Sequence, residues 1–260
     1  MFDKSKGTKK VTRRTVLQRG AGVAAASAFA AAVSHPPAAA APRPRADALP
    51  TAVAGVRIPD SGLAREAAAF ARGASTETLF NHVMRTYLFG CLMFDQQGVR
   101  YDRELVFVAS VLHDLGLVEA YRTPNERFEV DGADAAQRFL REQRMSADRV
   151  AVVWDAIALH TTAGIAARKR PEIAMIAVGS GMDFSGNGLQ KLPSDALDDV
   201  LTAFPRKGFK QEAIDTIVSL CRTKPMGELM HPFAEVGRRH IADFSVPTVE
   251  DLLLAAPFED

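Results

Sequence analysis

The sequence predicts an all-α domain, a helical bundle, that follows an N-terminal export signal. Apolar residues recur every three to four positions in most segments after about residue 75, which is the period of a helix face. No stretch alternates apolar and polar residues for long enough to make a credible sheet. A basic head followed by an alanine-rich apolar run precedes all of these segments. The chain therefore divides into a leader and one helical body.

The leader has the order of a twin-arginine (Tat) signal peptide. Arg13 and Arg14 precede an apolar run from Gly20 to Val33, which is too short and too rich in small residues for a stable membrane span. Ala38-Ala39-Ala40 then offers a cleavage site of small residues. We expect a signal peptide at residues 1–40, a flexible mature N-terminus at residues 41–56, and a periplasmic or extracellular protein delivered by the twin-arginine export machinery.

The composition of the mature part argues against a nucleic-acid partner. Removing residues 1–40 takes away seven Lys/Arg and one Asp, which shifts the formal net charge from +1 to −5. Polyanion binding depends on Lys and Arg, so we expect no nucleic-acid partner. We also expect no stable membrane span in the mature form. Two cysteines, Cys91 and Cys221, are too few for a disulfide framework. Whether they pair is left open by the sequence, as is the oligomeric state.

Helix signals follow one another along the body. Residues 79–94 form a helix by their apolar recurrence, with N-cap candidates at residues 75–78. Residues 103–115 form a nearly all-apolar helix, which belongs in the middle of a bundle, and Gly116 is its expected stop. Residues 119–129 make a charged loop long enough to cover a cleft. Further helices are expected at residues 131–144, 147–160, 172–182, 194–203, 210–221, 227–238 and 248–255.

Polar residues interrupt these apolar helices, or end them, at four places: His82, the doublet His113-Asp114, His160 and Asp183. One divalent metal ion can draw neutral ring nitrogens and ionised oxygens into its coordination sphere and offset the cost of burying them. Taken singly, a His at the end of an apolar helix is more often a hydrogen-bonded core or capping residue, and a lone Asp is usually a cap. The four places together favour a metal site.

This order of residues resembles the HD superfamily of metal-dependent hydrolases, whose pattern is a His, a His-Asp doublet and a distant Asp. The resemblance implies an all-helical HD domain at residues 57–260, including C-terminal helices, with a metal core at residues 75–185. It also implies that one divalent metal ion is bound by His82, His113, Asp114 and Asp183. Zinc is the expected ion, and iron or manganese suit the same donors.

Longer phrases are similar to one branch of the superfamily, the cyanamide hydratase-like HD proteins. This resemblance implies a hydrolase or hydratase that adds metal-activated water to a small molecule, such as the nitrile-type group of cyanamide, which would become urea. The phrases that carry it are Asn81-His82-Val83-Met84-Arg85-Thr86-Tyr87, Arg127-Phe128-Glu129-Val130-Asp131-Gly132-Ala133-Asp134-Ala135-Ala136, Trp154-Asp155-Ala156-Ile157-Ala158-Leu159-His160-Thr161 and Arg222-Thr223-Lys224-Pro225.

Two residues are expected to be catalytic. The resemblance implies that Asp114 is a metal ligand that also orients the attacking water, and that His160 lies near the metal. His160 is therefore the candidate for delivering a proton to the substrate nitrogen or for orienting the substrate.

Three further residues are candidates for substrate binding, each with a structural alternative. Thr161 and Thr162 could hydrogen-bond a small substrate, although simple helix termination explains them equally well. Arg85 holds substrate or pairs with Asp183 or Glu129. Three other residues have open roles. Glu129 and Asp131 either orient a histidine or interact with the helix dipole, and His231 either lies near the cleft or is a surface or capping residue.

Other functions remain open. An HD-type phosphohydrolase acting on a nucleotide or phosphoester predicts a cationic cradle beside the metal, and Arg168-Lys169-Arg170 is the only dense basic cluster of the mature part. A non-catalytic metal-binding HD protein would keep the ligands without turnover. A two-metal oxygenase would need additional histidines between His113 and His160, and the sequence has none there.

Overall fold

The computed structural model describes residues 48–258, so the expected signal peptide at residues 1–40 lies outside the described residues. Within this range the chain forms eleven α-helices, four short 3-10 helices and one hairpin of two short strands. The prediction of an all-α body is confirmed. None of the described helices is both long and apolar enough to cross a membrane.

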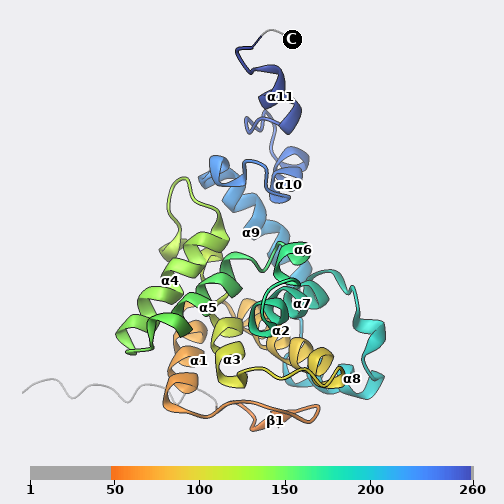
Figure 1. The fold of residues 1–260 in the computed structure, drawn as a ribbon. Helices are drawn as coiled ribbons and strands as arrows, with labels where there is room; N and C mark the ends of the chain where they lie inside the picture. Colours follow the sequence, from red (N-terminus) through yellow and green to blue (C-terminus); the bar gives the residue numbers. More distant parts are fainter. Residues whose placement is uncertain (1–47, 259–260) are drawn as a thin grey trace, which may run out of the picture. The chain divides into compact units, whose positions relative to one another are not determined.

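Two long helices, α2 (Glu77–Gln96) and α7 (Pro171–Ser185), pack against each other in the middle of the bundle (Figure 1). The side chain of Thr76 caps α2 by accepting a hydrogen bond from the backbone N–H of Leu79. Proline begins α7, and Gly186 ends it with a φ of 79°, a left-handed conformation that glycine adopts without strain. Both helices are buried along most of their length.

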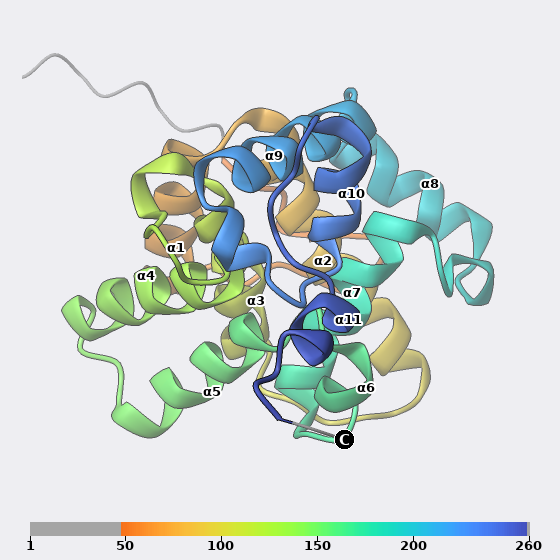
Figure 2. The same cartoon turned by 90° about the horizontal axis from the view of Figure 1, so that it is seen from above.

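The other helices surround this pair (Figures 1 and 2). On one side, α3 contacts α1, α2 and α5, and α4 packs against α5. The C-terminal helices continue from α9, which contacts both α2 and α10. The remaining bounds are α1 (Gly62–Ala74), α3 (Arg103–Leu112), α4 (Phe128–Glu142), α5 (Ala147–Ala158), α6 (Ala163–Ala166), α8 (Ser194–Ala203), α9 (Phe209–Thr223), α10 (Phe233–His240) and α11 (Val249–Leu254).

Several elements differ from the sequence expectation, and the short helix α6 is one that was not expected. Helix α1 was not expected, because its buried face consists of the small residues Ala64, Ala67, Ala68 and Ala71, which give a weak apolar signal. Residues 52–57, all but the last of which were expected to be flexible, pair as β1 (Ala52–Val53) and β2 (Val56–Arg57). The segment expected as a helix from residue 227 is instead a 3-10 turn, η4 (Pro225–Glu228), and α10 begins only at Phe233.

Gly116 also has a different role from the expected helix stop. Helix α3 ends at Leu112, and the chain continues into a 3-10 turn, η1 (Leu115–Leu117). A Cβ atom at Gly116 would overlap the backbone carbonyl of Phe128 at the start of α4. The glycine therefore lets η1 and α4 approach each other closely.

The two cysteines are both free. Cys91 in α2 and Cys221 in α9 are buried thiols that do not pair with each other. Burial raises the pKa of each thiol to about 11, so both are protonated and unreactive at neutral pH.

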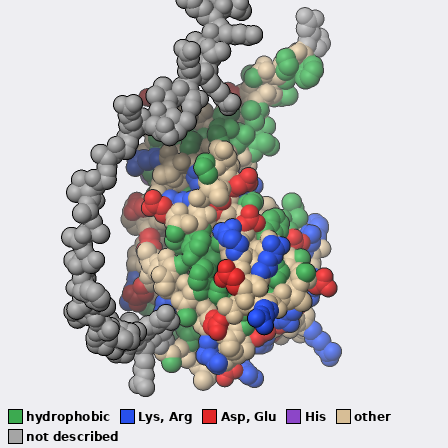
Figure 3. Space-filling view, turned by 90° about the vertical axis from the view of Figure 1, so that its left-hand side faces the viewer, with side chains coloured by type: hydrophobic (Ala, Val, Ile, Leu, Met, Phe, Trp, Pro, Cys, Tyr) green, Lys and Arg blue, Asp and Glu red, His purple; other side chains and the backbone are tan. Residues whose placement is uncertain are grey.

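On the face seen in Figure 3, positively charged Lys/Arg side chains and negatively charged Asp/Glu side chains are interspersed and do not form separate patches.

Replacing Gly179 with alanine is expected to destabilise the fold by about 1–3 kcal/mol, because overpacking strains a close helix contact. A Cβ atom there would overlap the backbone carbonyl of Thr86 across the α2–α7 contact. The matched control is Gly181→Ala in the same helix, where no atom lies within 4 Å of the added Cβ and where alanine should stabilise by up to about 1 kcal/mol. Urea unfolding of both variants measures the difference, and equal effects would contradict the prediction.

Candidate metal centre

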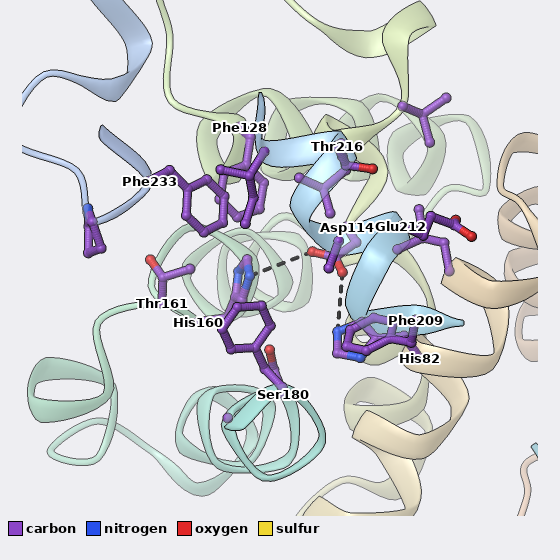
Figure 4. Close-up of a pocket in the computed structure, with 18 of the residues that line it drawn as sticks. His82, Asp114, Phe128, His160, Thr161, Ser180, Phe209, Glu212, Thr216 and Phe233 are labelled. Carbon is purple, nitrogen blue, oxygen red and sulfur yellow. Dashed lines mark ion pairs between the residues drawn. The ribbon is translucent and has the colours of Figure 1, made fainter. Parts of the chain in front are cut away.

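Three histidines from three helical segments point one ring nitrogen each toward Asp114. The Nε2 atoms of His82 and His113 each lie 3.3 Å from Oδ2 of Asp114, and Nε2 of His160 lies 3.7 Å from its Oδ1. All four side chains are at most 6% exposed. Figure 4 shows Asp114 between His82 and His160. The structure thus brings together residues that lie far apart in the sequence.

The opposite nitrogen, Nδ1, anchors each of these rings. Nδ1 of His113 lies 2.7 Å from the carbonyl oxygen of Ser110, and Nδ1 of His160 lies 2.7 Å from that of Ile157. Because a carbonyl oxygen only accepts, these two rings donate from Nδ1 and leave Nε2 with a free lone pair. Nδ1 of His82 lies 2.6 Å from Asp183. These contacts set the tautomers that metal ligands require.

The end of α3 explains why the doublet can serve one site. His113 is the C-cap of α3 and keeps helical dihedral angles, whereas Asp114 has left the helix, with φ −102° and ψ 16°. This change of direction lets two adjacent side chains reach the same point. Phe209 from α9 stacks on the ring of His82, with centroids 4.7 Å apart.

The electrostatics of the cluster favour a cation. Burial acts to raise the pKa of Asp114, but His113, His82 and His160 hold it well below its usual value, so the carboxylate is ionised. Burial acts to lower the pKa of His82, but hydrogen bonds to Asp114 and Asp183 outweigh it and raise that pKa to about 8. Burial lowers the pKa of His113 to about 3, which keeps this ring neutral.

The donor set fits a divalent metal ion. One ligand atom each from His82, His113 and Asp114 can be chosen so that all lie within 4.8 Å of one another. Nε2 of His113 is buried and has no hydrogen-bond partner, which is costly unless something else binds it. Two imidazoles and a carboxylate are common ligands of a catalytic zinc ion. His160 adds a third imidazole at the edge of the same cluster.

Asp183 takes a different position from the expected one. Its carboxylate contacts Nδ1 of His82, the far side of the ring, and lies outside the cluster of three ligands. Arg85 donates to both of its oxygens at 2.7 and 2.8 Å, and Arg206 donates at 2.9 Å. The structure therefore places Asp183 as the residue that orients His82.

The structure distinguishes between the two expected roles of Arg85, which are substrate binding and a salt bridge. Its side chain is fully buried, pairs with Asp183, and donates to the backbone carbonyls of Phe204 and Pro205. It does not line the cavity at the cluster. Arg85 therefore forms the salt bridge with Asp183 and is not placed to bind substrate in this cavity.

A cavity of about 490 Å³ lies over the cluster. His82, Asp114 and His160 line it, together with the aromatic residues Phe128, Phe209 and Phe233 (Figure 4). Phe184 is a further aromatic residue of the lining. Among the described residues that line it, none is Lys or Arg. Glu119, from the loop expected to cover a cleft, is among its walls, as is Val118 just before that loop.

The two threonines have different roles. Thr161 lines the cavity and donates to Glu129. Thr162 donates to the carbonyl oxygen of Leu159 at 2.7 Å and is not in the lining, as simple helix termination predicts.

The C-terminal segment contributes to the cavity through His231. Of the alternatives for this residue, the structure shows the position near the cleft: His231 is buried, lines the cavity and lies 3.0 Å from Glu129. Glu129 therefore contacts a histidine, as one alternative predicted, but not one of the metal cluster. Asp131 instead pairs with the buried Lys224. The short phrase Leu229-Met230-His231-Pro232-Phe233 was the only signal.

Metal affinity is expected to rise about tenfold per pH unit between about pH 5.5 and about pH 7. In the metal-free protein His82 has a pKa of about 8, so its Nε2 carries a proton below that pH, and a metal ion must displace the proton. Calorimetric titration with zinc in buffers of different ionisation enthalpy measures this proton release. A pH-independent affinity would contradict it.

The comparisons with known proteins agree with this geometry. A search of curated proteins found no match to the chain. The HD domain family matches residues 79–201, the part that carries His82, His113, Asp114, His160 and Asp183. Together with the buried cluster of two histidines and an aspartate, this match supports assignment of the segment to the HD superfamily, whose members are typically metal-dependent hydrolases.

Proposed function

We propose that this protein is a zinc-dependent hydratase or hydrolase that adds water to an electrophilic carbon, of nitrile type, in a small uncharged molecule with an apolar body. The observation that carries the proposal is the buried cluster of His82, His113 and Asp114 beneath an aromatic cavity whose described lining contains no Lys or Arg. Such a lining suits a neutral, partly apolar substrate.

The residues of the chain have distinct tasks in this reaction. A divalent ion at the cluster supplies the activation of water at neutral pH. The ionised carboxylate of Asp114 accepts a hydrogen bond from the attacking water and orients it. His160 faces the cavity with the lone pair of Nε2, which can take up a proton and pass it to the substrate nitrogen. The four phenylalanines exclude bulk water from the reacting atoms.

The size of the cavity favours a nitrile larger than cyanamide. A volume of about 490 Å³ lies in the range that holds drug-sized ligands, and the aromatic walls would leave so small a molecule as cyanamide with few contacts. Cyanamide itself therefore serves as the minimal substrate in the test. The phosphohydrolase alternative is disfavoured, because Arg168, Lys169 and Arg170 lie outside the cavity lining.

The test loads the full chain with zinc and measures metal content, then offers cyanamide, benzylcyanamide and a panel of nucleotides and aryl phosphates. We expect about one zinc ion per chain, urea from cyanamide and faster formation of benzylurea from benzylcyanamide. His113→Ala, which removes a ligand, is the matched negative control. Release of phosphate, or a fully loaded protein that hydrates no nitrile, would overturn the proposal.

Export through the twin-arginine route stays a prediction. It depends on residues 1–40, which lie outside the described residues. The order of basic head, apolar run and small-residue end is what supports it.

A further inference from the structure

A chain of hydrogen bonds connects the cavity wall to a buried histidine of the C-terminal segment. The hydroxyl of Thr161 donates to Oε1 of Glu129, and Nε2 of His231 lies 3.0 Å from the same oxygen. Thr161 and His231 both line the cavity, whereas Glu129 is fully buried behind them. The proposed reaction assigns no task to these three residues.

The charge of Glu129 fixes the direction of the hydrogen bond from Thr161. Arg127 donates to Oε1 of Glu129 at 2.6 Å, and a carboxylate beside a guanidinium is ionised and can only accept. Every group that contacts Oε1 must therefore donate. A hydroxyl has a single proton, so the oxygen of Thr161 is left as an acceptor. Among the described residues, the Oγ1 atom of Thr161 has one other hydrogen-bond contact, a long one of 3.4 Å from Arg127. A lone pair of Oγ1 therefore remains for a ligand.

Packing holds His231 in place as a donor to Glu129. Its ring meets the ring of Phe233 edge-on, with centroids 4.5 Å apart, and lies 5.9 Å from that of Phe128. Nδ1 of His231 lies 3.0 Å from Glu228, on the side away from Glu129. The imidazole is thus confined between two aromatic rings and two carboxylates. It keeps Oε1 of Glu129 facing Thr161.

We propose that Thr161 selects substrates that present an N–H group, and that Glu129 and His231 are positioning residues that keep Thr161 an acceptor. Thr161 follows His160 in the chain and lines the same cavity, so the N–H it binds belongs close to the reacting carbon. The inference rests on the proposed function, because it names the substrate class of that site. It favours a monosubstituted cyanamide over the fully N-alkylated counterpart, and primary amides serve as unreactive analogues of the product.

Binding of a matched pair of probes tests the inference without any turnover. Benzamide has two N–H donors, and N,N-dimethylbenzamide has none. By calorimetry on the zinc-loaded full chain, we expect benzamide to bind about tenfold more tightly, the value of one good hydrogen bond. Thr161→Val removes the hydroxyl but keeps the shape, and should reduce the ratio of affinities to about one. Thr161→Ser restores an acceptor and should retain the preference.

The positioning role has its own matched variants. His231→Gln keeps an amide N–H that can reach Glu129 and should preserve the preference, whereas His231→Leu removes the donor and should lower the ratio at least about threefold. A merely structural role for His231 would weaken both probes equally and leave the ratio unchanged.

The outcomes separate the two proposals. A preference for benzamide that disappears in Thr161→Val supports the inference even if no nitrile is hydrated, in which case only the proposed function fails. Equal affinities for the two probes in the wild-type protein, an unchanged ratio in Thr161→Val, or no binding of either probe would overturn the inference.

Discussion

Asp114→Ala is expected to lose both the bound metal and the activity, with a fall in kcat/KM of roughly a thousandfold or more, because it removes a ligand and the group that orients water. Asp114 is the only carboxylate in the cluster with His82 and His113, and it lies within 4 Å of all three histidine Nε2 atoms. Without it, the three Nε2 atoms face each other with no carboxylate between them. Metal analysis and steady-state kinetics on the zinc-loaded enzyme measure the two losses.

The control for Asp114→Ala is Glu212→Gln. Glu212 is another carboxylate of the cavity lining, and it contacts Thr76 rather than the cluster. We expect this variant to keep its metal. Full metal occupancy with wild-type turnover in Asp114→Ala would show that the cluster is not the metal centre.

Arg85→Leu is expected to destabilise the fold by about 3–5 kcal/mol, because it leaves a buried carboxylate without its main partner. Arg85 is fully buried, and it donates to both oxygens of Asp183. The carbonyls of Phe204 and Pro205 would lose their donor as well. Urea unfolding measures the loss. Metal affinity should also fall, since Asp183 orients His82.

Arg206 provides the comparison for Arg85. Arg206 donates to Oδ1 of Asp183, one of the two oxygens that Arg85 contacts. Its side chain is 31% exposed, so water can replace part of the interaction. We expect Arg206→Ala to cost about 1 kcal/mol or less. Equal destabilisation by the two variants would mean that the burial of each arginine does not determine how much its salt bridge with Asp183 stabilises the fold.

Much of the fold and of the metal site could be predicted from local features of the sequence. The helices that became α2, α5 and α7 follow from apolar recurrence and from caps such as Thr76 and Pro171, which act within one turn. The His113-Asp114 doublet is adjacent in the chain, so its shared location needed no knowledge of packing. The alanine-rich α1 was missed because alanine gives a weak hydrophobic signal even where it is fully buried.

The sequence by itself therefore determined most of the helical segments and the polar residues that lie in them or at their ends. Only the tertiary structure decided which of these residues meet. Asp183 contacts the far side of His82 rather than the metal cluster, because Arg85 and Arg206 hold its carboxylate there. His231 reaches Glu129 across a separation of 102 residues. Such pairings depend on how helices dock, and periodicity along a chain carries no information about docking.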